Sequence, residues 1–157
     1  MNEQIKELLQ LPDFRQGEHW RRCDFPAGAE VFRLGDGGME LFFIEHGTVR
    51  VLGRVRLDEE RQVSPGVTDL TEGEVFGEIQ LFDGEPRSAT VICVTACRLA
   101  IINGEELVAY MERNPERGFE FLRALVTTLV KRLRKSNQKI FTLLAWGLKA
   151  HHIDGHL

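Results

Sequence analysis

Residues 76–91 read FGEIQLFDGEPRSATV and place a glycine–glutamate pair ahead of an arginine–serine–alanine run. Gly77 has no Cβ, so the backbone there can approach a ligand closely. Glu78, when ionised, only accepts hydrogen bonds, so it suits a hydroxyl donor and repels an anion. Arg87 presents a planar fork of N–H donors that matches two oxygens of an anionic group, and Ser88 adds a hydroxyl beside it. With an anion-binding nest of backbone N–H groups at such a turn, the stretch predicts a cradle for one small anion beside a hydroxyl.

The order of these residues resembles the phosphate-binding cassette of cyclic nucleotide-binding domains. This family includes the bacterial catabolite activator protein, the regulatory subunits of protein kinase A and gated ion channels. Its pattern is F-G-E-(L/I)-x-L-(L/F), a short variable turn, and R-(S/A/T)-A-x-V. Every fixed element is present, as Phe76, Gly77, Glu78, Ile79, Leu81, Phe82, Arg87, Ser88, Ala89 and Val91.

The resemblance implies that the chain binds a cyclic nucleotide through this cassette. The implied ligand-binding residues are Phe76, Gly77, Glu78, Arg87, Ser88 and Ala89. Arg87 and Ser88 would then bind the cyclic phosphate, and Glu78 would accept a hydrogen bond from the ribose 2′-hydroxyl. The simpler alternative is an ordinary salt bridge between Glu78 and Arg87 that closes a β-turn.

Length and composition fit one domain over residues 1–157. A hydrophobic fraction of 43% is enough for a core, and the chain has no run of 18 apolar residues that would predict a transmembrane helix. Its first residues do not form a secretory signal peptide, so we expect a cytoplasmic protein. The cysteines Cys23, Cys93 and Cys97 are expected to be free thiols in a reduced compartment, with Cys93 and Cys97 on one side of a single strand.

Three zones follow one another along the chain. Residues 1–22 are expected to be an N-terminal helical segment that Pro12 interrupts. Residues 24–102 contain short runs of β-forming residues between turn signals, which indicates a barrel or sandwich. The resemblance makes this zone an eight-stranded β-roll of jelly-roll type, in an α+β fold with helices in residues 103–147.

Helix signals are clear in the last zone. Asn103 with Glu106 is a capping box, and Asn114 with Pro115 predicts the N-cap and first residue of a second helix. This long helix should run to about Trp146, where the next glycine would end it.

The long helix has an apolar heptad pattern. Its members are Phe119, Leu122, Val126, Leu129, Leu133, Ser136, Ile140 and Leu143. Such a seam predicts two helices that pair, and bacterial members of the family usually pair through this helix. The alternative is one amphipathic helix lying on its own β-roll.

Further ligand contacts are implied by alignment with the family. Ser136 and Asn137 occupy the positions at which relatives of the catabolite activator protein touch the nucleotide base, one from each subunit. Alternatively, Ser136 is a polar residue that sets the helix register. Val51 would lie near the sugar and base, and Val67 is a weaker candidate for the same wall.

Charge is unevenly distributed along the chain. The net charge is −4, whereas residues 116–140 carry seven bases and two acids. This stretch could attract nucleic acid, but such a run is more often the solvated face of a helix. Only eleven residues follow Trp146, too few for the helix-turn-helix domain of bacterial regulators, so direct sequence-specific DNA binding is not expected. The initial Met favours a stand-alone sensor over a fragment.

These observations predict a cyclic nucleotide sensor, most simply a bacterial homodimer that binds cAMP, or else cGMP, and acts on an effector protein. We expect no catalytic residues, because no activated nucleophile with a neighbouring base is visible. We expect no cofactor and no metal, since a cupin would need paired histidines in the β zone. The tail histidines His151, His152 and His156 would bind metal only adventitiously. The alternative function is a ligand-independent β-roll that serves as a dimerisation module.

Overall fold

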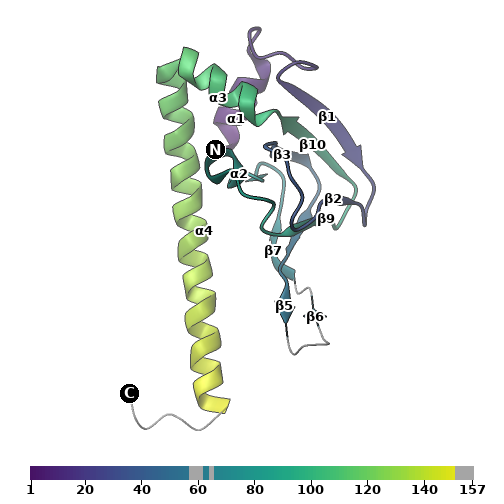
Figure 1. Ribbon diagram of the computed structural model, residues 1–157, viewed down its shortest axis with the longest axis vertical. Coiled ribbons are helices and arrows are strands. Elements are labelled where there is room, and N and C mark those ends of the chain that lie inside the picture. Colours follow the sequence, from purple (N-terminus) through teal and green to yellow (C-terminus); the bar gives the residue numbers. More distant parts are fainter. Residues whose placement is uncertain (57–61, 64–65, 151–157) are drawn as a thin grey trace.

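The computed structural model describes residues 1–56, 62–63 and 66–150. Ten strands form two four-stranded antiparallel sheets and one short hairpin in this part of the chain (Figure 1). The first sheet has the order β1 (Trp20–Phe25), β10 (Cys97–Ile102), β3 (Leu41–His46), β8 (Val75–Phe76). The second has the order β2 (Glu30–Phe32), β9 (Thr90–Cys93), β4 (Val49–Leu52), β7 (Gly66–Leu70). The eight strands of these two sheets confirm the predicted eight-stranded β-roll, and β5 (Val55–Arg56) and β6 (Gln62–Val63) form an additional hairpin.

Strand β10 shows how the roll and the helices share one core. Leu99 and Ile101 pack into the cluster between the two sheets, whereas Ala100 and Ile102 pack on the other face of the first sheet. That second face is covered by helices, because Leu107 of α3 (Gly104–Arg113) and Phe121 of α4 (Pro115–Ala150) belong to the same cluster. The strand is therefore buried on both faces, which explains its near-continuous apolar sequence.

The expected helix starts are confirmed, but three details differ. The Asn103 side chain accepts a hydrogen bond from the Glu106 backbone N–H at 3.2 Å, but the Asn103 backbone N–H donates to the His19 carbonyl at 2.9 Å, so only half of the expected capping box forms. The side-chain amide of Asn114 instead donates to the Tyr110 carbonyl at 3.0 Å, so it completes the end of α3. Helix α4 also passes through Gly147 and continues to Ala150. Gly147 is not among the glycines with positive φ, so it does not form the left-handed cap that ends a helix.

The N-terminal zone is less helical than predicted. Helix α1 covers only Asn2–Gln10, and the roll begins with β1 at Trp20 rather than at Asp24. Leu11 is extended because the following proline disfavours a helical conformation. The indole N–H of Trp20 donates to the Phe14 carbonyl at 3.3 Å, a tertiary contact that no local pattern predicts.

The prediction that Cys93 and Cys97 share one strand was wrong. Cys93 ends β9 and Cys97 begins β10, so the two residues meet across the turn between these strands. Both are buried in the cluster between the sheets, and all three cysteines are free thiols. Burial, reinforced by a hydrogen bond with Cys97, raises the pKa of the Cys93 thiol to about 12.

Figure 1 shows α4 running along the side of the roll, with its last turns extending beyond the two sheets. None of the helices in the described ranges combines the length and the apolar content that a membrane span needs.

Candidate functional site

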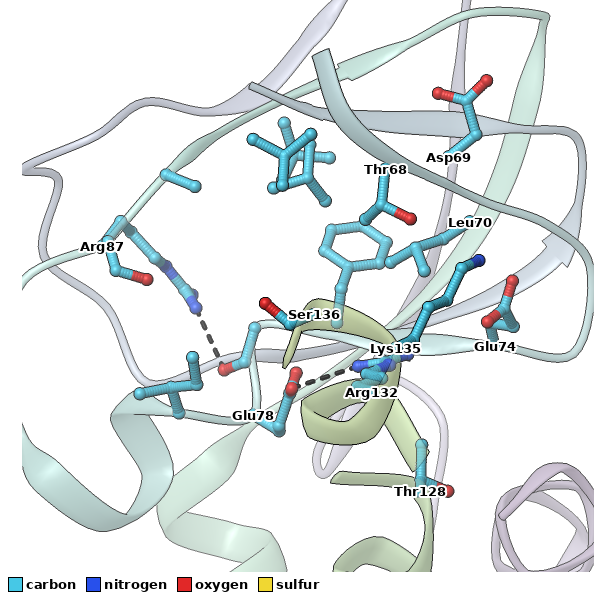
Figure 2. A pocket seen from close by; sticks show the side chains of 18 of the residues that line it. Thr68, Asp69, Leu70, Glu74, Glu78, Arg87, Thr128, Arg132, Lys135 and Ser136 are labelled. Carbon is cyan, nitrogen blue, oxygen red and sulfur yellow. Dashed lines mark hydrogen bonds and ion pairs between the residues drawn. The ribbon is translucent and has the colours of Figure 1, made fainter. Parts of the chain in front are cut away.

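A cavity of about 510 Å³ lies between the β-roll and α4. Its walls come from β7, from the cassette around β8 and α2 (Gln80–Asp83), from residues 87–89, and from one face of α4. Figure 2 shows side chains from these elements pointing toward one another across the cavity. The cassette therefore borders a concave space of the kind in which small ligands bind.

Gly77 fixes the shape of the cassette. Its φ is 80°, a conformation that other residues rarely adopt. A Cβ built on it would lie 2.8 Å from Nη1 of Arg87 and 2.9 Å from the Glu40 carbonyl oxygen. The glycine thus allows the arginine to pass directly against the backbone. Gly84, with φ of 67°, ends α2 and turns the chain back toward Arg87.

The Arg87 guanidinium is fixed in a buried position, with 3% of the residue exposed. It donates to the Gly77 carbonyl at 3.1 Å, to the Glu40 carbonyl at 3.1 Å and to the Glu40 carboxylate at 3.3 Å. Its Cζ lies 4.3 Å from the centre of the Phe32 ring. Burial lowers the pKa of Arg87, and the Glu40 carboxylate opposes that shift, but an arginine stays charged in proteins.

The hydrogen bonds within the protein do not use every N–H donor of this arginine. Nε of Arg87 is buried and has no hydrogen-bond partner among the described residues. A buried donor without a partner costs free energy, so its presence beside a cavity favours a ligand with oxygen acceptors. Sequence reasoning identified Arg87 but missed Glu40, which lies 47 positions away in the chain.

Glu78 is held by a cation from α4. It is 5% exposed, and its Oε1 accepts a hydrogen bond from Nη1 of Arg132 at 3.1 Å. Arg132 also donates to the Val75 carbonyl. The interpretation of Glu78 and Arg87 as one turn-closing salt bridge was wrong, because Glu78 pairs with Arg132 and Arg87 pairs with Glu40.

The structure brings eight of the nine expected site residues to the cavity wall. These are Val51, Phe76, Gly77, Glu78, Arg87, Ser88, Ala89 and Ser136. Val67, the weaker candidate, also lines the cavity. Asn137 does not line it and is exposed on α4.

Several cavity residues were not predicted. They include Thr68 of β7 and Thr128, Lys131, Arg132, Lys135 and Lys139 of α4. The helical members lie three or four positions apart, so they share one face with Ser136. This spacing was the signal available in the sequence. Lys139 Nζ donates to the Val67 carbonyl at 2.8 Å, which adds a second link between α4 and the roll.

The apolar stripe of α4 is mostly exposed and does not pack on the roll along most of its length. Phe121 and Leu125, which are not heptad members, pack into the core. The seam residues Phe119, Val126 and Leu133 are each more than half exposed, at 66%, 57% and 61%. The alternative in which the seam covers its own roll therefore fails along most of the helix, although Leu129 is partly buried against the core.

Metal chemistry finds no support in the described part of the chain. No group of three or more His, Cys, Asp or Glu side chains there is arranged to hold a metal ion. The tail histidines His151, His152 and His156 lie outside the described residues.

Comparisons with known proteins agree with this geometry. The family model of the cyclic nucleotide-binding domain matches residues 22–114. A CRP-like cAMP-activated global transcriptional regulator of Mycobacterium tuberculosis is 30% identical over 121 residues, which are 77% of this chain and 50% of that protein. The chain thus spans about half the length of this curated relative.

Solved structures show the same fold. The catabolite activator protein of Thermus thermophilus matches with a TM-score of 0.66 at 26% identity, over 90% of this chain and 59% of that one. A cyclic nucleotide-binding domain from Methylobacillus flagellatus matches with a TM-score of 0.74 at 22% identity, over 90% and 73% of the two chains. The matched family model and these relatives, together with the cassette and the cavity, show that the chain belongs to the cyclic nucleotide-binding domain family.

Proposed function

We propose that this cyclic nucleotide-binding regulatory module takes cAMP as its ligand, has no enzymatic activity and acts on a partner protein in the cytoplasm. The observation that carries the proposal is the buried Arg87 guanidinium, which lines the cavity and has an Nε donor without a partner among the described residues. A guanidinium in that state is suited to a phosphate, whose oxygens accept several N–H donors at once. The cAMP-activated relative from Mycobacterium tuberculosis supports adenine as the base.

The same wall accommodates the rest of the ligand. Ser88 and Ala89 follow Arg87 and line the cavity beside it, where the hydroxyl and backbone N–H groups suit the remaining phosphate oxygens. Glu78 is buried at the cavity wall, and its carboxylate oxygens are acceptors that suit a ribose hydroxyl. Because Arg132 donates to Glu78 at 3.1 Å, a ribose would compete with α4 for this carboxylate. Ligand binding would then favour one position of α4 over another through its differential affinity for the two.

The first test is a thermal unfolding series with cAMP. A ligand that binds only the folded protein at 100 times its Kd adds about 2.7 kcal/mol of stability, so the melting temperature should rise clearly. Linear 5′-AMP, which carries the same base and sugar without the closed phosphate ring, is the control and should give a smaller shift. A melting temperature unmoved by any cyclic nucleotide would support the alternative, a ligand-independent dimerisation module.

We further propose that two copies pair through the exposed stripe of α4. Ser136 lines the cavity of its own chain, whereas Asn137 is rotated by about 100° around the helix axis. This turn places Asn137 away from its own cavity and leaves it available to a second copy packed on the stripe. The exposed Val126 and Leu133 would then be covered, as a coiled-coil seam requires.

A charged substitution in the stripe should prevent the two copies from pairing. Val126→Glu is expected to convert a dimer into a monomer, because pairing would bury two like charges in an apolar seam. Thr127→Glu is the matched control, since Thr127 is an exposed neighbour that is not a seam member. Analytical ultracentrifugation measures the oligomeric state of wild type and of both variants. A wild-type monomer, or a dimer that survives Val126→Glu, contradicts pairing through α4.

A further inference from the structure

The end of the cavity opposite Arg87 carries a cation that the phosphate and ribose contacts leave unused. Figure 2 shows Lys135 on the far side of the cavity from Arg87, with Thr68, Leu70 and Glu74 around it. Within the described ranges, no ion pair or hydrogen bond joins the Lys135 ammonium to another group. This end of the site therefore has a donor with three N–H bonds to offer.

Most of the neighbouring charged groups of the cavity are already engaged. Asp69 accepts two hydrogen bonds from Arg50, at 2.6 and 2.8 Å. Glu74 Oε2 accepts from the Thr71 backbone N–H at 2.8 Å. Arg132 and Lys139 are bound to the roll through Glu78 and the Val67 carbonyl. Lys135 and Lys131, one helical turn apart on α4, line the cavity without a partner among the described residues. Of the two, Lys135 is the one that Figure 2 places beside Thr68 and Leu70, so it is the cation at this end that a ligand can recruit without breaking a described contact.

The layout of the site indicates which part of a nucleotide reaches Lys135. The phosphate is assigned to Arg87 and the ribose to Glu78, which lies between Arg87 and the α4 cations in Figure 2. In a nucleotide the base extends from the ribose on the side away from the phosphate. The edge of the base therefore comes to the Lys135 end, beside Thr68 and Ser136.

An ammonium group distinguishes between purines. Guanine presents two adjacent acceptors, O6 and N7, and lysine pairs with them readily. Adenine has the N7 acceptor but carries an amino donor at the neighbouring position, which an ammonium group cannot accept from. Lys135 consequently stabilises a base with a 6-oxo group more than it stabilises adenine.

We propose that Lys135 is a specificity-determining residue that admits 6-oxopurine cyclic nucleotides, so that the cavity takes cGMP as well as cAMP. This inference rests on the proposed function, because it assigns the phosphate to Arg87. It extends that function by widening the ligand class to cyclic purine nucleotides and by naming the side chain that sets the preference.

The test is a calorimetric titration of cAMP, cGMP and cyclic IMP into wild type, Lys135→Met and Arg134→Met. Lys135→Met should lower the affinity for cGMP and cyclic IMP by at least about fivefold, because the ammonium donor to O6 and N7 is lost. The affinity for cAMP should change less. Cyclic IMP has the 6-oxo group without the 2-amino group, so it isolates the contact with O6. Arg134→Met removes an equal charge from the adjacent exposed position, which does not line the cavity, and should leave the cGMP-to-cAMP ratio unchanged.

The outcomes separate this inference from the proposed function. Wild-type protein that binds no cyclic nucleotide overturns both. Binding of cAMP with an unchanged cGMP-to-cAMP ratio in Lys135→Met overturns the role of Lys135 alone. If Lys135→Met loses affinity for cGMP but keeps its affinity for cyclic IMP, the role of Lys135 is also overturned, because the 2-amino group would then be the feature that is recognised. Lys135→Arg keeps a cationic donor and should retain more cGMP binding than Lys135→Met.

Discussion

Arg87→Ala should lower the affinity for cAMP at least about tenfold, the largest loss expected from any single substitution in the cavity. The guanidinium is held by two carbonyl oxygens and the Glu40 carboxylate, and it keeps Nε unpaired. A hydrogen bond to a charged group contributes about 1.5–3 kcal/mol, and each 1.4 kcal/mol is tenfold in affinity. Isothermal titration calorimetry with cAMP measures the loss directly.

This experiment needs a control for folding, because Arg87 is buried and its removal leaves the Gly77 and Glu40 carbonyls without their donor. Arg87→Lys keeps the charge but loses the planar fork, so it should bind cAMP more weakly than wild type while it unfolds at a higher temperature than Arg87→Ala. Arg98→Ala removes an exposed arginine that pairs with Asp24 far from the cavity and should leave binding unchanged. Wild-type affinity in a folded Arg87→Ala protein would remove the assigned role of Arg87.

The sequence predicted the cassette well because its residues are close together in the chain. Gly77, Glu78 and Arg87 lie within eleven positions, and the φ of 80° at Gly77 explains why the pattern needs a glycine. The partners of these residues were not predictable in the same way. Arg132 reaches Glu78 from 54 positions away, and Glu40 reaches Arg87 from 47 positions away. Such pairs depend on how α4 packs on the roll and on how the chain entering β3 lies beside the cassette, and no local period encodes that packing.

The heptad illustrates a second limit of sequence reasoning. Its period indicated an apolar stripe, but a period does not say which surface covers the stripe. The structure shows that Phe121 and Leu125, rather than the seam, pack against the roll. Most of the seam is left exposed. The same geometry separates Ser136 from Asn137, which the sequence could only treat as a pair. Which residues of α4 line the cavity depends on the face that the helix turns toward the roll, and that face is fixed by tertiary contacts.

Gly104→Ala should lower the free energy of unfolding by about 1–3 kcal/mol or more, although alanine is normally the better residue in a helix. Gly104 is the first residue of α3 and is buried. A Cβ at this position would lie 1.9 Å from the Met39 carbonyl oxygen and 2.4 Å from Cδ2 of Leu81. The closest of these atoms belongs to the backbone before β3, so a side-chain rotation cannot relieve the clash. Either α3 or this backbone segment must shift.

Gly147→Ala is the matched control, because Gly147 also lies in a helix but has no atom within 4 Å of the added Cβ. There the substitution should stabilise the protein by up to about 1 kcal/mol through helix propensity alone. Urea unfolding measures the free energy of unfolding of both variants. Its change should have opposite signs in the two if the close approach of α3 to residues 39 and 81 is correct. A neutral or stabilising effect of Gly104→Ala would show that the start of α3 does not press against the chain entering β3. The cassette helix α2, which carries Leu81, would then lack the support that holds it beside Arg87.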